Sequence, residues 1–210
     1  MISRLALAAA LLLTAGLLIA ACGDDGNGAG SNAGDEGVAC APSDMQWDAP
    51  PDVTIDPSKT YVATIVTEKG NIVVELFSDV TATANNFVFL AREGFYDCST
   101  FHRVIPGFVA LDGDPTGTGA GGPGYAIPDE DDGGHLFEAG VMGMAKAGPD
   151  TTGSQFFITY APQPTLDADF TVFGRVIEGM DVLQQLTPRD PAAPNAPPGD
   201  LIETVTIEER

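Results

Sequence analysis

The chain has 210 residues, of which 30 are acidic and only 9 are basic, so its formal net charge is −21 at pH 7. Such a negative surface repels nucleic acid and anionic lipid headgroups, which excludes nucleic acid as a partner and allows membrane contact only through an attached lipid.

The first residues are typical of a secretory signal peptide. Arg4 gives a positive start, and residues 5–18 are almost entirely apolar, a run too short for a transmembrane helix. The residues before Cys22 (Ile19-Ala20-Ala21) resemble a bacterial lipobox, which implies lipidation of the Cys22 thiol. The alternative is an ordinary signal peptide that is cut nearby. We therefore expect a signal peptide at residues 1–21 and a lipoprotein that is exported and anchored to the outer face of the cell membrane.

Residues 22–57 are rich in Gly, Asp and Pro, and we expect them to form a flexible tether. Residues 58–210 are then one domain of common size, expected to be a monomer. With Cys22 lipidated, Cys40 and Cys98 remain as a pair in an oxidising compartment, where a disulfide would persist. Two independent thiols are the alternative.

The periodicity of the domain predicts many short strands and two helices. Runs rich in β-formers at residues 61–67 and 71–77 flank a hairpin signal, and helical spacing over residues 81–92 ends near Gly94. Further strands are expected at residues 100–105, 108–111, 141–145, 156–159, 171–177 and 201–207, with a second helix at residues 181–186. This pattern predicts a mainly β fold, a closed antiparallel barrel.

Two sequence motifs indicate the chemistry of the site. The first is the run Phe101-His102-Arg103-Val104-Ile105-Pro106-Gly107-Phe108, and the second is Gly153-Ser154-Gln155-Phe156-Phe157. A single Arg beside an apolar floor suits a ligand with an apolar ring and a carbonyl, such as a proline and its preceding peptide bond. Both motifs resemble the signature of the cyclophilin family of peptidyl-prolyl isomerases. The resemblance covers residues 60–207 and implies an eight-stranded barrel with two capping helices.

The resemblance also implies a role for each position that matches the family. Arg103 would donate a hydrogen bond to the proline nitrogen during isomerisation, Gln155 would orient the substrate backbone, and His102 would be structural. Contact with the substrate would come from Phe108, Val109, Leu111, Ala145, Lys146, Ala147, Phe157, Leu166 and Phe170. The partners would be proline-containing unfolded or flexible polypeptides, and no cofactor would be needed.

Leu111 departs from the family pattern, which usually has a Gln followed by Gly-Gly at this point. That Gln orients the catalytic Arg, and a Leu cannot. Asp112 offers Arg103 an alternative partner. Two functions therefore stay open: an isomerase that helps exported proteins fold, and a proline-peptide binding module or chaperone with little turnover.

The remaining sequence motifs give weaker evidence about function. The Gly-rich run at residues 114–124 lacks the Gly-Lys-Ser/Thr of a phosphate-binding loop, and we interpret it as a loop beside the groove. The acidic run at residues 129–132 fails the calcium-loop pattern because Gly140 stands at the closing Glu position. The two histidines have no metal-ligand spacing, so we expect no metal. The proline-rich residues 188–198 are interpreted as a surface linker.

Overall fold

The computed structural model describes residues 40–210, so the expected signal peptide, Cys22 and the first part of the expected tether lie outside the described residues. The strands are β1 Tyr61–Thr67, β2 Gly70–Leu76, β3 Arg103–Val104, β4 Val109–Asp112, β5 Val141–Met144, β6 Phe156–Thr159, β7 Val172–Glu178 and β8 Ile202–Glu209. The helices are α1 Thr81–Arg92 and α2 Met180–Gln184. Within residues 40–210, neither helix has the length and apolarity needed to cross a membrane.

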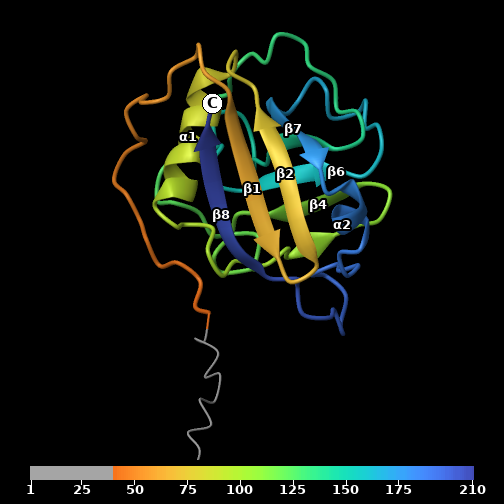
Figure 1. The fold of residues 1–210 in the computed structure, drawn as a ribbon. Helices are drawn as coiled ribbons and strands as arrows, with labels where there is room; N and C mark the ends of the chain where they lie inside the picture. Colours follow the sequence, from red (N-terminus) through yellow and green to blue (C-terminus); the bar gives the residue numbers. More distant parts are fainter. Residues whose placement is uncertain (1–39) are drawn as a thin grey trace, which may run out of the picture. The chain divides into compact units, whose positions relative to one another are not determined.

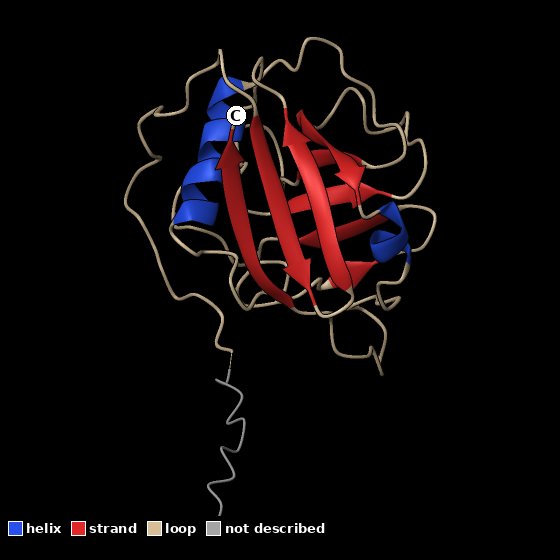
Figure 2. Ribbon diagram, viewed as in Figure 1, coloured by secondary structure: helices blue, strands red, loops and turns tan. Residues whose placement is uncertain are grey.

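The eight strands form one antiparallel sheet that curls into a half-barrel. Their order is β3-β4-β6-β5-β7-β2-β1-β8. In Figure 1, β8, β1 and β2 run side by side, and β4 and β6 cross behind them. Helix α1 flanks the sheet on the β8 side, and the short α2 lies near the start of β2 on the other (Figure 2). The expectation of a mainly β fold with two helices is confirmed.

The expectation of a closed barrel is wrong, because β3 and β8 end the sheet without forming a ladder with each other. The segment before β3 meets the start of β8 through short contacts, among them the isolated bridge between Thr100 and Leu201 and a hydrogen bond from the Cys98 N–H to the Ile202 carbonyl at 2.9 Å. The outer edge of β3 is occupied instead by Arg189: the Val104 N–H donates to the Arg189 carbonyl at 2.8 Å, and the Arg189 N–H donates back at 2.9 Å. A loop segment thus separates the two edge strands, and the barrel stays open.

Helix α1 forms where the sequence predicts it, because its apolar residues recur on one face. Phe87 on that face is fully buried, stacks on Tyr96 at a centroid distance of 5.0 Å and meets Phe156 edge-on at 5.5 Å. The chain turns after the helix at Gly94, whose φ of +73° is strained for residues with a side chain. The main core therefore lies between α1 and the concave face of the sheet.

The described part of the expected tether packs against this domain. A disulfide joins Cys40 to Cys98, with Cα atoms 5.3 Å apart. The Trp47 ring lies edge-on to Phe89 at 5.2 Å, and Ile55 is only 5% exposed. Isolated apolar residues among prolines show no periodicity, so the pattern gave no sign of this packing. The folded unit begins before the expected boundary at residue 58.

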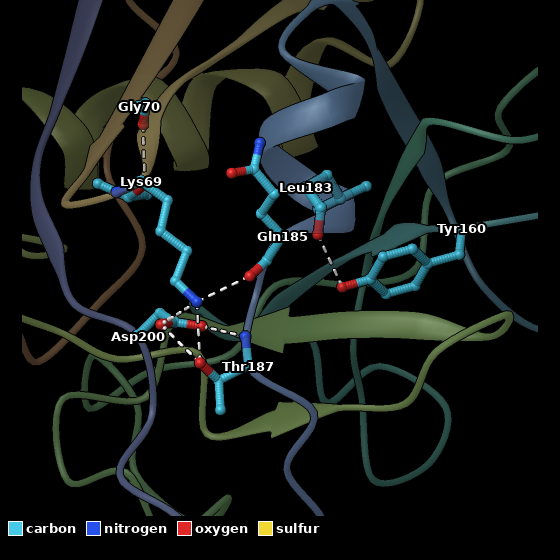
Figure 3. Close-up of polar contacts among 8 residues, drawn as sticks. Lys69, Gly70, Tyr160, Leu183, Gln185, Thr187 and Asp200 are labelled. Atoms are coloured by element: carbon cyan, nitrogen blue, oxygen red, sulfur yellow. Dashed lines mark hydrogen bonds and ion pairs between the residues drawn. The ribbon is translucent and has the colours of Figure 1, made fainter.

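A polar cluster secures the loop at residues 185–201, which connects α2 to β8 (Figure 3). The ammonium of Lys69 lies 2.9 Å from a carboxylate oxygen of Asp200, and it donates to the Gln185 carbonyl at 2.7 Å and to the Thr187 hydroxyl at 2.9 Å. Asp200 also accepts hydrogen bonds from the backbone N–H and the hydroxyl of Thr187. The cluster fixes the base of the loop that carries Arg189 to the edge of β3.

Candidate active site

A groove of about 980 Å³ crosses the convex side of β4 and β6 and is closed on one side by the loop at residues 119–126. The structure brings together at this groove every residue to which the resemblance gave catalysis or substrate contact: Arg103, Phe108, Val109, Leu111, Ala145, Lys146, Ala147, Gln155, Phe157, Leu166 and Phe170.

Side chains alternate between the two faces of each strand, and the side chains of neighbouring strands that face the groove are apolar, which gives the groove an apolar floor. Val109 and Phe157 are 4% exposed and belong to a small hydrophobic cluster that is separate from the main core. Phe157 stacks on Phe137 with centroids 5.2 Å apart and meets Phe170 edge-on at 5.6 Å. Leu166 packs against the same cluster. These apolar side chains form a pocket that is suited to a proline ring.

Arg103 is exposed at the rim of this pocket and lies directly opposite Leu111 in the β3–β4 pairing. Asp112 is the next residue on β4 and therefore points to the other face, where it is fully buried and its carboxyl group lies 3.0 Å from the Ser99 hydroxyl oxygen. The interpretation that Asp112 holds Arg103 is wrong. Among residues 40–210, no side chain forms an ion pair or hydrogen bond with the guanidinium, which leaves its donors available to a substrate.

Gln155 holds the wall of the groove. Its side-chain N–H groups donate to the carbonyls of Gly119 at 3.1 Å and Gly121 at 2.9 Å. The residue is placed by a close approach of β4 and β6: a Cβ atom on Gly113 would lie 2.3 Å from the Ser154 carbonyl oxygen, so only glycine fits there. With both N–H groups engaged, the amide oxygen of Gln155 remains as an acceptor for a substrate N–H.

The Gly-rich run is an ordered wall built on one carboxylate. Asp114 accepts hydrogen bonds from the backbone N–H groups of Thr116 at 2.7 Å, Thr118 at 3.1 Å and Gly119 at 2.6 Å. Burial acts to raise the pKa of Asp114, but hydrogen bonds from Thr116, Gly121 and Gly119 outweigh it and hold the pKa below its usual value. Asp114 is thus a charged anchor for this loop, and the interpretation of the Gly-rich run as a loop beside the groove is confirmed.

His102 is 1% exposed, and neither ring nitrogen has a hydrogen-bond partner in the described part of the chain. Burial lowers the pKa of its imidazole, so the ring is neutral near pH 7. Its ring lies behind Gly119, with Nε2 3.8 Å from the position that a Cβ atom on Gly119 would occupy, and it does not line the groove, which fits a structural role. No three His, Cys, Asp or Glu side chains within residues 40–210 gather to hold a metal ion.

Thr151 and Gln46 are among the groove residues that were missed in the sequence. Thr151 accepts hydrogen bonds from the backbone N–H groups of Ala147 and Gly148, both at 3.0 Å, and so shapes the turn that follows Lys146. The Gly148-Pro149 turn signal could have indicated it. Gln46 lines the groove from the N-terminal segment, where the sequence gave no signal at all. Lys146 itself turns its ammonium to Asp129 at 2.6 Å.

Comparisons with known proteins agree with this geometry. Residues 62–207 match the family model described as cyclophilin type peptidyl-prolyl cis-trans isomerase/CLD. The chain is 49% identical over 144 residues to peptidyl-prolyl cis-trans isomerase B of Bacillus subtilis (67% of this chain, 94% of that protein). It is 47% identical over 154 residues to a peptidyl-prolyl cis-trans isomerase of Helicobacter pylori (71% of this chain, 88% of that protein).

A solved structure shows the same fold. It is a cyclophilin type peptidyl-prolyl cis-trans isomerase of Cryptosporidium parvum, crystallised in the presence of the dipeptide Ala-Pro. The TM-score is 0.64 at 34% identity, and the match covers 70% of this chain and 98% of the other. With the family model, the relatives and the fold in agreement, this chain belongs to the cyclophilin-type peptidyl-prolyl cis-trans isomerases.

Proposed function

We propose that this groove isomerises Xaa-Pro bonds in exported proteins and that Arg103 supplies the catalytic hydrogen bond. The barrier of about 18–20 kcal/mol arises from the amide resonance that is lost as the bond twists. In the twisted state the proline nitrogen becomes pyramidal and regains a lone pair. A guanidinium above the pocket stabilises this state and not the planar ground states, which is the condition for catalysis. The observation that carries the proposal is the position of Arg103 beside the apolar pocket, with its guanidinium not engaged by any side chain of residues 40–210.

Other residues of the groove would position the substrate. The ring enters the pocket formed by Phe108, Val109, Phe157 and Leu166, and the preceding residues lie along Ala145 to Ala147 and Gln155. An acceleration of about ten thousandfold needs only about 5–6 kcal/mol, which preorganised electrostatics and removal of water can supply. The chemistry of the groove requires neither a covalent nucleophile nor proton transfer.

Leu111 favours a second candidate, a proline-peptide binding module with little turnover. It lies opposite Arg103, where a hydrogen-bonding side chain could restrain the guanidinium, and it has no polar atom. An Arg that is free to sample several rotamers is less preorganised, and loss of one positioning hydrogen bond lowers catalysis by about tenfold to a thousandfold. Binding of the ring to the pocket would be unaffected.

Leu111→Gln separates the two candidates. We expect it to raise kcat for exchange of a short Xaa-Pro peptide by about tenfold, with KM within about twofold, because only the twisted state gains a better-oriented guanidinium. Leu111→Met is the matched control, since it keeps size and apolarity, and it should leave both constants unchanged. A wild-type chain that binds the peptide without accelerating exchange would establish the binding module instead.

We further propose that the protein acts outside the cytoplasm, tethered by a lipid on Cys22. The apolar N-terminus with its lipobox-like end supports this, and so does the Cys40–Cys98 disulfide, because such bonds persist in oxidising compartments. The clients would be proline-containing exported polypeptides that are still unfolded or flexible.

Cell fractionation with a labelled fatty acid tests the tether. The full chain should be labelled and sediment with membranes, and Cys22→Ser should lose the label and leave the membrane fraction. Cys98→Ser is the matched control and should keep the label. A Cys22→Ser chain that still carries label and stays on the membrane would overturn the proposal.

A further inference from the structure

The segment at residues 40–57 precedes the region that matches the family model, yet it contributes to the groove. It is held on the domain by the Cys40–Cys98 disulfide and by the Trp47 ring against Phe89. Further along, the side-chain oxygen of Asn85 accepts a hydrogen bond from the Thr54 N–H at 2.8 Å. These contacts fix the segment at several points along its length.

The segment holds the outer side of the groove wall. The Trp47 N–H donates to the Pro123 carbonyl at 2.9 Å, and a side-chain N–H of Gln46 donates to the Gly122 carbonyl at 2.7 Å. The two backbones approach so closely that a Cβ atom on Gly124 would lie 2.7 Å from the Trp47 carbonyl oxygen. Because Gln155 grips the same loop from the groove side, the wall is fixed between two glutamine amides.

The orientation of the Gln46 amide is set by these bonds. Its nitrogen donates to Gly122 and also to the Met45 carbonyl at 2.9 Å, so both N–H groups are engaged within the protein. No donor within residues 40–210 reaches its oxygen, and the residue is exposed on the groove. The Gln46 oxygen lies beside the wall, 3.0 Å from the position that a Cβ atom on Gly124 would occupy, and it is left there as a carbonyl-type acceptor.

We propose that Gln46 determines specificity for the peptide segment that precedes the proline, by accepting a hydrogen bond from a Lys or Arg side chain at least two residues before it. This rests on the proposed function, which places the ring on the apolar floor and the preceding residues along Gln155 and the wall. A cationic donor is favoured because charged donors form stronger hydrogen bonds to an acceptor and because the chain carries a net charge of −21.

The test uses paired peptides with Lys or norleucine at the second, third or fourth position before proline, because norleucine keeps the apolar chain and removes the donor. For at least one position we expect wild-type kcat/KM to favour Lys by about fivefold, the order of one exposed charge-assisted hydrogen bond. Gln46→Met should reduce this preference to about one, by lowering kcat/KM for the Lys peptides more than for the norleucine peptides.

Gln185→Met is the matched control, since Gln185 also donates to a backbone carbonyl, that of Asp181, but lies just after the end of α2 and outside the groove. It should retain the preference for Lys. A purely structural loosening of the wall in Gln46→Met would slow both members of a peptide pair equally, which would overturn the proposal, as would a wild-type enzyme that shows no preference. Absence of exchange with every peptide would instead contradict the proposed function.

Discussion

Asp112 lies behind the groove with an unusual set of hydrogen bonds. Its carboxyl group is fully buried and faces the Ser99 hydroxyl at 3.0 Å, while that hydroxyl also lies 2.8 Å from the Tyr96 carbonyl. A single hydroxyl proton cannot serve both acceptors. If Asp112 is protonated, it donates to Ser99, and Ser99 donates to Tyr96. Burial raises the pKa of Asp112 to about 7, in agreement with this arrangement.

The raised pKa makes a prediction about stability and pH. In the unfolded chain the carboxyl titrates near 3.8, so between about pH 4 and pH 7 the folded state binds more protons than the unfolded state. The contribution of Asp112 to the free energy of unfolding is thus greatest below pH 4. It is lost as the pH rises toward 7, by an amount on the order of 3 kcal/mol. Asp112→Asn reproduces the protonated hydrogen bonds and should remove this loss.

The measurement is the free energy of unfolding of Asp112→Asn minus that of wild type, from pH 5 to pH 8, by urea denaturation. The difference should grow in favour of the variant up to about pH 7 and then level off. Taking the difference removes the pH dependence that comes from carboxyl groups with a lowered pKa, such as Asp129 beside Lys146, because both proteins share it. Those groups stabilise the fold more as the pH rises, which is the opposite of the effect of Asp112. A difference that does not change with pH would show that Asp112 is ionised throughout.

At the scale of elements, Arg103, the proposed catalytic residue, depends on a strand of only two residues, β3. One edge of β3 pairs with β4, and Arg189 occupies the other edge. The Arg189 guanidinium also donates to the His102 carbonyl at 2.9 Å, on the peptide that precedes Arg103, and to the Pro197 carbonyl. Arg189 therefore positions the backbone from which the Arg103 side chain extends.

Arg189→Met should lower kcat of isomerisation by about threefold to tenfold, because the guanidinium of Arg103 is less well placed in the twisted state. Peptide binding should change by less than about twofold, since the apolar pocket is untouched. Exchange rates at several peptide concentrations give kcat and KM separately, and Arg189→Lys should restore part of kcat by keeping one donor.

Thr187→Val provides the control for this effect. It loosens the base of the same loop at the Lys69–Asp200 cluster (Figure 3) and leaves the contacts of Arg189 intact. We expect kcat within about twofold of wild type. If Thr187→Val and Arg189→Met lower kcat equally, general order in the loop matters and Arg189 has no separate positioning role.

At the scale of the whole molecule, the sequence predicted the individual strands and helices better than it predicted whether the barrel closes. The hairpin at residues 61–77, the helix at residues 81–92 and the strand at residues 156–159 appear within about one residue of their expected bounds, because each follows from periodicity and turn residues. Whether the sheet closes depends on which segment occupies the outer edge of β3. That contact joins Val104 to Arg189 across the chain, and no local pattern reports it.

The candidate site shows the same division. Two motifs located Arg103, Gln155 and the apolar floor, because they carry a recognisable combination of residues in order. Sequence alone could not place Asp112, whose face of β4 was decided by the one-residue alternation of the strand. It also missed Gln46, since a segment rich in proline and glycine offers no periodicity even where a disulfide and a Trp hold it on the domain.

The most direct test of the central claim is cis–trans exchange of a short Xaa-Pro peptide, measured by NMR with the mature chain, Arg103→Ala and Arg103→Lys. Wild type should accelerate exchange strongly. Arg103→Ala should lower kcat on the order of a hundredfold while peptide affinity stays within about threefold, and Arg103→Lys should restore only part, because an ammonium lacks the planar, fixed donors of a guanidinium. Equal acceleration by wild type and Arg103→Ala would contradict the assignment of catalysis to Arg103.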